Sequence, residues 1–89
     1  MDKEIWELKT ITGNGKRTLD SAIKDKKNQA NIFIFDMTYS NMDTDTIIKQ
    51  TIKTMKNRNW IKKIIIVKNN KLIKVFENKK EIDYDSKRN

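Results

Sequence analysis

The chain has 89 residues, enough for one domain with a single hydrophobic core. Hydrophobic and charged residues each make up 36% of it, and 20 Lys and Arg residues against 12 Asp and Glu residues give a formal charge of +8. The sequence contains neither cysteine nor histidine, which excludes disulfides, thiolate metal sites and histidine-based acid–base catalysis. The positive charge favours a polyanionic partner, and nucleic acid is the leading candidate.

The apolar runs are short and alternate with lysine, and none approaches the roughly 20 residues that a membrane-spanning helix needs. Residues 1–4 lead directly into an alternating pattern, without the apolar segment of a secretory signal peptide. We therefore expect no membrane partner and a cytoplasmic site of action.

Residues 4–11 alternate in the manner of a β-strand, with Trp6 and Leu8 on one face and Glu7 and Lys9 on the other. Since the face with tryptophan and leucine is the more apolar, we expect it to lie in the core. Glu7 and Lys9 are then expected to share the opposite face of this first strand.

A turn at residues 13–15 holds both glycines of the chain, and glycine tolerates the positive φ angles of tight turns. From Thr18 to about Gln29, apolar side chains recur at helical spacing, and Thr18 is suited to cap the first turn. The sequence therefore predicts a short helix whose outer face is rich in lysine.

Residues 31–38 form an apolar run typical of a central strand that is covered on both faces. The polar segment that follows offers Asp43 or Thr44 as a helix cap. An amphipathic helix is predicted over residues 44–57, with one apolar stripe formed by Ile47, Ile48, Ile52 and Met55.

Two further strands, residues 61–68 and 71–77, flank Asn69 and Asn70, a pair that tolerates the left-handed backbone of a two-residue hairpin turn. Residues 78–89 are charged and aperiodic, so we expect a poorly ordered tail.

The predicted fold is a single α/β domain over residues 1–77, followed by the charged tail of residues 78–89. Its elements follow the order β-α-β-α-β-β. The two helical crossovers should make the first three strands parallel, so the prediction is a small mixed sheet with helical cover.

Glu7 and Lys9 place a carboxylate and an ammonium group on one strand face. In a phosphodiesterase such a carboxylate binds Mg²⁺ or Mn²⁺, while the lysine orients the attacking water or stabilises the charge of the phosphorane. The alternative is a solvent-facing pair without a function, since this spacing arises often by chance.

The loop that precedes the first helix offers Lys16, Arg17 and Thr18 as phosphate ligands. Lys24 and Lys27, with Lys26 between them, extend this basic surface along the helix. The alternative for both groups is a solvated basic face.

Asp36 lies in the apolar run, and a carboxylate on a central strand is costly unless it is paired or binds a metal. If the first two strands are adjacent and parallel, Asp36 can stand beside Glu7 and Lys9. The alternative is a carboxylate that caps the following turn.

These features belong to two segments, WELKTITGNGKRTLDSAIKDKKNQANIFIFDMT and KKIIIVKNNKLIKVFE. Together they resemble the nuclease toxin domains of contact-dependent growth inhibition proteins and related domains of mobile elements. The resemblance covers residues 5–77 and implies a PD-(D/E)XK, restriction-endonuclease-like core that cuts tRNA or DNA with a divalent metal ion. By position, Glu7 and Lys9 match its Glu-x-Lys motif, and Gln29 matches its helix residue that faces the site. Its substrate loop corresponds to Lys16, Arg17 and Thr18.

That family has a further metal-binding Asp on an earlier strand, and Asp36 is the expected substitute here. The first hypothesis is thus a metal-dependent nuclease toxin that cleaves RNA, with tRNA as the favoured substrate, using Glu7 and Asp36 as metal ligands and Lys9 and Gln29 as catalytic groups. It implies delivery into a target cell and an acidic immunity protein as partner. The alternative is a non-catalytic nucleic-acid-binding or protein-interaction module of phage or mobile-element origin.

Overall fold

The computed structural model describes residues 3–77 and 80–82. The described elements are, in chain order, β1 (Trp6–Thr10), α1 (Thr18–Ile23), β2 (Ile32–Asp36), α2 (Thr44–Asn57), β3 (Lys63–Lys68), β4 (Lys71–Glu77) and β5 (Lys80–Ile82). They form one sheet with the order β1-β2-β3-β4-β5. The first three strands are parallel, and β4 and β5 are antiparallel to their neighbours.

The predicted small mixed α/β sheet is confirmed, and α2 has the predicted bounds. Asn69 and Asn70 form the hairpin turn with φ angles of 52° and 63°, as expected of a left-handed turn pair. The fifth strand was not predicted, because residues 80–82 fall in the segment expected to be a tail. Residues 78–79 and 83–89 of that segment lie outside the described residues.

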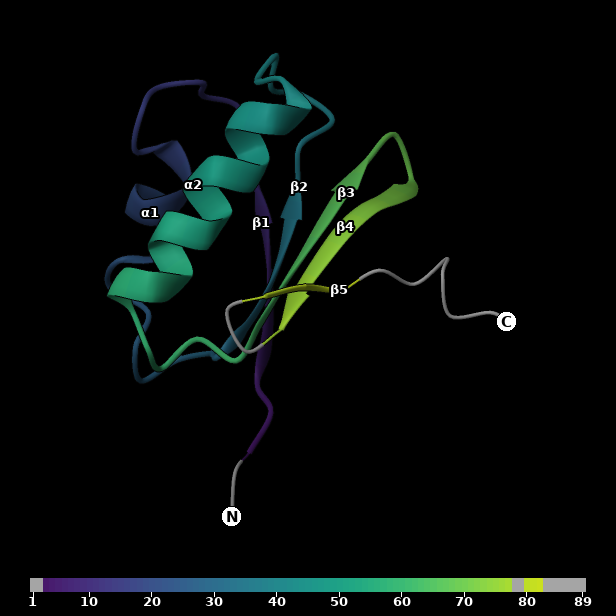
Figure 1. The fold of residues 1–89 in the computed structure, drawn as a ribbon. Helices are drawn as coiled ribbons and strands as arrows, with labels where there is room; N and C mark the ends of the chain where they lie inside the picture. The colour runs from purple at the N-terminus through teal and green to yellow at the C-terminus, as the bar shows by residue number, and fades with distance from the viewer. Residues whose placement is uncertain (1–2, 78–79, 83–89) are drawn as a thin grey trace.

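Both helices pack on the same face of the sheet (Figure 1). Two right-handed crossovers that move along a sheet in one direction have this result. The core forms between the two layers, where alternate side chains of the central strands meet the apolar sides of the helices. Its fully buried members include Phe33, Phe35, Ile64, Ile66 and Phe76 from the sheet and Leu19, Ile23 and Met55 from the helices.

The predicted orientation of the first strand is wrong. Glu7 and Lys9 are in register with the buried Phe33 and Phe35, so they lie on the face that the helices cover. Trp6, Leu8 and Thr10 project from the other, open face, where the side chains of Trp6 and Leu8 are 50% and 60% exposed.

The reason for this reversal is that β1 is the edge strand on the side of the short helix α1. The core contact on its inner face comes from Ile11, which follows the strand, has the parity of Glu7 and Lys9, and is only 3% exposed. Polar side chains at the border of the helical layer keep access to water while their stems are covered.

Helix α1 is also shorter than predicted, since it ends at Ile23 instead of near Gln29. The amide of Lys26 donates to the carbonyl of Ile23 at 3.0 Å, and turns follow. Residues 24–29 are all polar, so a longer helix would gain no apolar burial to offset its ordering.

The start of α1 differs from the prediction as well. Thr18 lies inside the first turn, where its hydroxyl donates to the carbonyl of Gly15 at 3.1 Å, and Arg17 stands at the capping position without a capping hydrogen bond from its side chain. The positive φ angles expected at the two glycines are not adopted. Gln50 of α2 takes over the role of the cap: its Oε1 accepts from the amide of Leu19 at 3.1 Å, and its Nε2 donates to the carbonyl of Gly15 at 2.7 Å.

Asp43 caps α2 as expected, accepting from the amide and hydroxyl of Thr46 at 3.4 and 2.6 Å. Neither helix in the described part of the chain has the length and apolar character that a membrane span requires.

Candidate active site

Four polar side chains meet at the border between β1 and the turns that follow α1. Glu7 Oε2 lies 3.7 Å from Lys9 Nζ and 3.6 Å from Lys26 Nζ. Lys26 Nζ in turn donates to Gln29 Oε1 at 3.4 Å. We call these residues the Glu7 cluster: Glu7, Lys9, Lys26 and Gln29. The side chains of the three charged members are 26–29% exposed, so the cluster is partly shielded but open to a ligand.

The cluster joins the three residues that sequence analysis assigned to catalysis, Glu7, Lys9 and Gln29. Lys26 connects them, although its sequence position indicated only a lysine of the exposed helix face. The early end of α1 accounts for this contact, because the backbone turns at Lys26 instead of continuing as a helix. The spacing of three residues between Lys26 and Gln29 is the one signal in the sequence that could have suggested their pairing.

Asp36 does not join the cluster. In the sheet it is in register with Thr10 and Val67, on the face opposite to Glu7. Its Oδ1 accepts hydrogen bonds from the hydroxyl of Thr38 at 2.6 Å and from the amide of Thr38 at 3.0 Å. These two bonds, that of the hydroxyl above all, lower the pKa of Asp36. The carboxylate thus caps the turn after β2, and the expected convergence of Glu7 and Asp36 is not found.

The residues present do not fit a centre for Mg²⁺ or Mn²⁺. Among residues 3–77 and 80–82, no group of three or more potential metal-ligating side chains comes together. Glu7 is the one carboxylate of its cluster, and two ammonium groups stand within 3.7 Å of it. Hard divalent cations require several oxygen ligands, and neighbouring cations oppose their binding.

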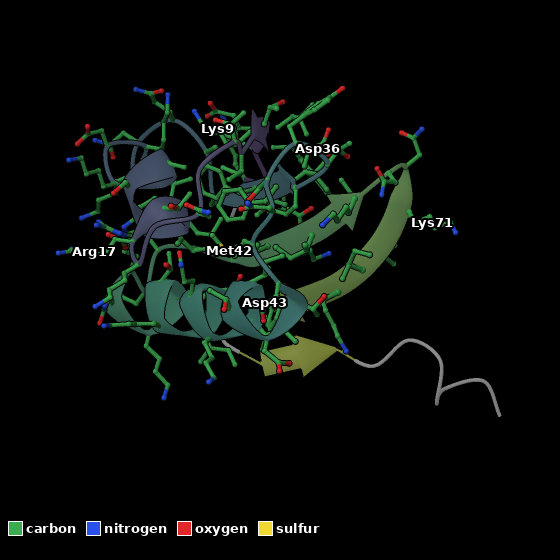
Figure 2. The ribbon with its side chains drawn as sticks, turned by 90° about the horizontal axis from the view of Figure 1, so that it is seen from above. Lys9, Arg17, Asp36, Met42, Asp43 and Lys71 are labelled. Atoms are coloured by element: carbon green, nitrogen blue, oxygen red, sulfur yellow. The ribbon has the colours of Figure 1, made fainter. Side chains whose placement is uncertain are left out.

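The predicted substrate loop lies elsewhere on the molecule. Figure 2 shows Arg17 projecting from the outer side of α1, well separated from Lys9 and Asp36. Its side chain is 79% exposed. Together with Lys16 it lines a pocket between α1 and α2. Thr18, which is half-buried, lines a shallow groove beside the end of β1 that Arg17 also borders.

Lys24 and Lys27 are exposed in the turn region that follows α1. They flank Lys26 in sequence, so the predicted basic surface continues from the Glu7 cluster into solvent. Exposed lysines in such a position suit contacts with a phosphate backbone that weaken as salt is added.

A family model described as "Contact-dependent growth inhibition CdiA C-terminal domain" matches residues 1–72. No curated protein and no solved structure gave a match. The matched region runs from before β1 to the start of β4 and includes the whole Glu7 cluster as well as the pocket between the helices. The chain therefore belongs to the family of CdiA C-terminal domains, the toxin domains of contact-dependent growth inhibition.

Proposed function

We propose that this toxin domain cleaves the phosphodiester bonds of RNA, with tRNA as the substrate class, and that the Glu7 cluster is its active site. The observation that carries the proposal is the set of contacts in the Glu7 cluster. Its carboxylate, two ammonium groups and side-chain amide each lie within 3.7 Å of another member. The formal charge of +8 supports a polyanionic substrate.

These groups suit an attack by the ribose 2′-hydroxyl on the adjacent phosphorus. The Glu7 carboxylate accepts the hydroxyl proton as the new P–O bond forms. Lys9 and Lys26 stabilise the negative charge that develops on the phosphoryl oxygens. As the bond to the 5′-oxygen breaks, one of the two ammonium groups donates a proton to that oxygen, and proton transfer from Glu7 restores the starting state. The products are a 2′,3′-cyclic phosphate and a 5′-hydroxyl end.

The test is incubation of the purified domain with tRNA and with DNA of the same length, in the presence of EDTA and of Mg²⁺ or Mn²⁺. We expect RNA cleavage without added metal and no DNA cleavage, because DNA lacks the 2′-hydroxyl. Glu7→Gln and Lys9→Met should each reduce the rate by about 100-fold or more. The matched control is Glu4→Gln, which removes an exposed carboxylate that pairs with Lys62 at 3.2 Å.

Cleavage that persists at the wild-type rate in both Glu7→Gln and Lys9→Met would contradict the assignment of the site. Strict dependence on a divalent metal would contradict the metal-free step and restore the metal-dependent nuclease predicted from the sequence.

A second candidate is a domain that binds nucleic acid without cleaving it. It is favoured by the single carboxylate of the Glu7 cluster, which can serve as the base but leaves the general-acid step to a lysine. This candidate predicts salt-sensitive binding of RNA that the same assay shows to stay intact.

Toxin domains of this family are delivered into target cells and commonly have immunity-protein partners. For this chain we propose an acidic immunity protein, since a partner for a domain of charge +8 gains affinity and association rate from negative charge. A complex whose association rate does not fall with added salt would contradict this.

A further inference from the structure

A pocket of about 240 Å³ lies between the start of α1 and the second half of α2. Four of its lining residues on α2 follow the spacing i, i+3, i+4 and i+7, from Gln50 to Asn57, so one stripe of the helix forms a wall. The opposite wall comes from the loop before α1 and its first turn. The charged lining residues are Lys16, Arg17, Asp20 and Lys53.

The charges of this pocket are unbalanced in favour of an anion. Asp20 is engaged by Arg58, which donates two hydrogen bonds to its carboxylate at 2.7 and 3.0 Å. That pairing offsets the negative charge of Asp20. Lys16, Arg17 and Lys53 line the pocket with three further cations, of which Arg17 also lies 3.7 Å from Asp20. One carboxylate cannot offset Arg58 and these three together, so the lining keeps a net positive charge that favours an anion.

The two walls are held in place by contacts that do not use Lys16, Arg17 or Lys53. Gln50 joins α2 to the amide of Leu19 and the carbonyl of Gly15, and Arg58 joins the end of α2 to Asp20. Both polar atoms of the Gln50 side-chain amide take part in these bonds, so we assign Gln50 to the support of the pocket and not to its ligands. The amide of Asn57 lies on the same wall as Lys53 and is exposed, which leaves it available as a neutral hydrogen-bond partner.

We propose that this pocket binds a phosphate group of the RNA, with Lys53, Lys16 and Arg17 as its ligands and Asn57 on the attached sugar. The inference rests on the proposed function, because it gives the same substrate a second contact away from the Glu7 cluster. A volume of 240 Å³ is below the about 300–1,000 Å³ of pockets for drug-sized ligands, and it suits one phosphate with its sugar. An internal phosphodiester and a terminal phosphomonoester both carry the anionic oxygens that these ligands would bind.

The test compares Lys53→Met with Lys49→Met. Both lysines are exposed on α2, but Lys49 does not line the pocket. Binding of a tRNA is measured at several salt concentrations in a Glu7→Gln background, which prevents cleavage during the measurement. We expect Lys53→Met to lower the slope of log affinity against log salt by about 1 and to weaken binding several-fold. Lys49→Met should change the slope clearly less, and circular dichroism should show both variants folded.

Oligonucleotides with a 5′-phosphate, a 3′-phosphate or free hydroxyl ends distinguish the two phosphate sources. A terminal phosphate in the pocket gives tighter binding of one phosphorylated form, and Lys53→Met removes that difference. An internal phosphate makes Lys53→Met weaken all three forms equally. Equal effects of Lys53→Met and Lys49→Met on every oligonucleotide overturn the inference, because the pocket would then contribute no more than the general field of the protein.

The readouts also separate this inference from the proposed function. A Lys53-specific loss of binding in a protein that never cleaves RNA would refute the proposed catalysis and leave the phosphate pocket standing. Glu7-dependent cleavage with no Lys53-specific effect on binding would have the opposite meaning.

Discussion

The guanidinium of Arg58 donates to both carboxylate oxygens of Asp20, from Nε to Oδ1 at 2.7 Å and from Nη2 to Oδ2 at 3.0 Å. The two side chains are 24% and 15% exposed, so the pair is largely shielded from water. It connects Arg58, the residue that follows α2, to the first turn of α1. A helix of six residues is not stable alone, and α1 therefore depends on such contacts with the rest of the fold.

Replacing Arg58 by methionine should lower the free energy of unfolding by about 1.5 kcal/mol, the lower range for hydrogen bonds to a charged group. Urea denaturation followed by circular dichroism measures it. Arg17→Met is the matched control, since Arg17 lies 3.7 Å from the same carboxylate but is 79% exposed. Its loss should cost less than about 0.5 kcal/mol. Equal costs would mean that the geometry of the Arg58 pair contributes nothing beyond its charge.

The same pair makes stability depend on pH. The hydrogen bonds from Arg58 hold the pKa of Asp20 below its usual value. The folded state therefore binds its proton less readily than the unfolded state, whose pKa is about 3.9. The stabilisation is present above that value and is lost as the pH falls through the lower pKa of the folded state.

Urea titrations of the wild type and of Asp20→Asn, at a series of pH values from neutral to about 3, test this dependence. The difference in unfolding free energy should be constant at neutral pH and should shrink only below about pH 4. Asp36 and Asp43 also have lowered pKa values, owing to hydrogen bonds from Thr38 and Thr46, and they are common to both proteins. A difference that grows on acidification would contradict the assignment to Asp20.

Within the Glu7 cluster, Lys26 should matter more than its sequence neighbour Lys27. Lys26 Nζ contacts both Glu7 and Gln29, whereas Lys27 is exposed. Under the proposed function, Lys26→Met should reduce the single-turnover rate of RNA cleavage by at least about 10-fold, within the range that a charge-stabilising group supplies. Lys27→Met should act mainly on binding, with a rate at saturating RNA close to wild type. Equal reductions of the saturated rate would remove Lys26 from the active site.

The open face of the sheet gives a test of the fold itself. Leu8 is 60% exposed there, so Leu8→Thr should change the unfolding free energy by no more than about 0.5 kcal/mol. Phe33, fully buried on the opposite face, should cost about 3–5 kcal/mol when replaced by alanine. Thermal or urea unfolding of both variants compares them. A loss of more than about 2 kcal/mol of unfolding free energy for Leu8→Thr would mean that Leu8 is buried in a core, as the sequence predicted.

The central part of the fold could be predicted because its sequence signals are redundant. The apolar run of β2 requires burial on both faces, and the stripe on α2 fits one helical period only. Asn69 and Asn70 combine a left-handed preference with two flanking strands, so the turn and its neighbours support one another.

The edges were harder to predict because their environment is decided by other segments. Alternation in β1 shows that two faces exist but does not say which one the helices cover. Ile11, which is buried and has the parity of Glu7, indicates the covered face correctly, whereas Trp6 and Leu8 indicate the opposite face. The contact of Lys26 with Glu7 depends in turn on where α1 ends, and the absence of apolar residues after Ile23 was the available sign.

The role of Asp36 in the site was also decided by other segments of the chain. Its alternative role as a turn cap was recognisable from Thr38 two residues later, a common arrangement for a side chain that bonds the backbone ahead of it. The choice between capping and catalysis depended on the parity of β1 relative to β2, which neither strand specifies alone.

The strand order of the sheet has a consequence for the order in which its parts can form. Every strand that the structure describes lies beside the strand that precedes or follows it in the chain, so none of them has to enter between two that are already paired. The β3–β4 hairpin joins residues that are near in sequence, whereas the parallel pairs β1–β2 and β2–β3 are each separated by a helical crossover and close longer loops. The hairpin should therefore pair first and offer β3 as the edge to which β2 and then β1 are added.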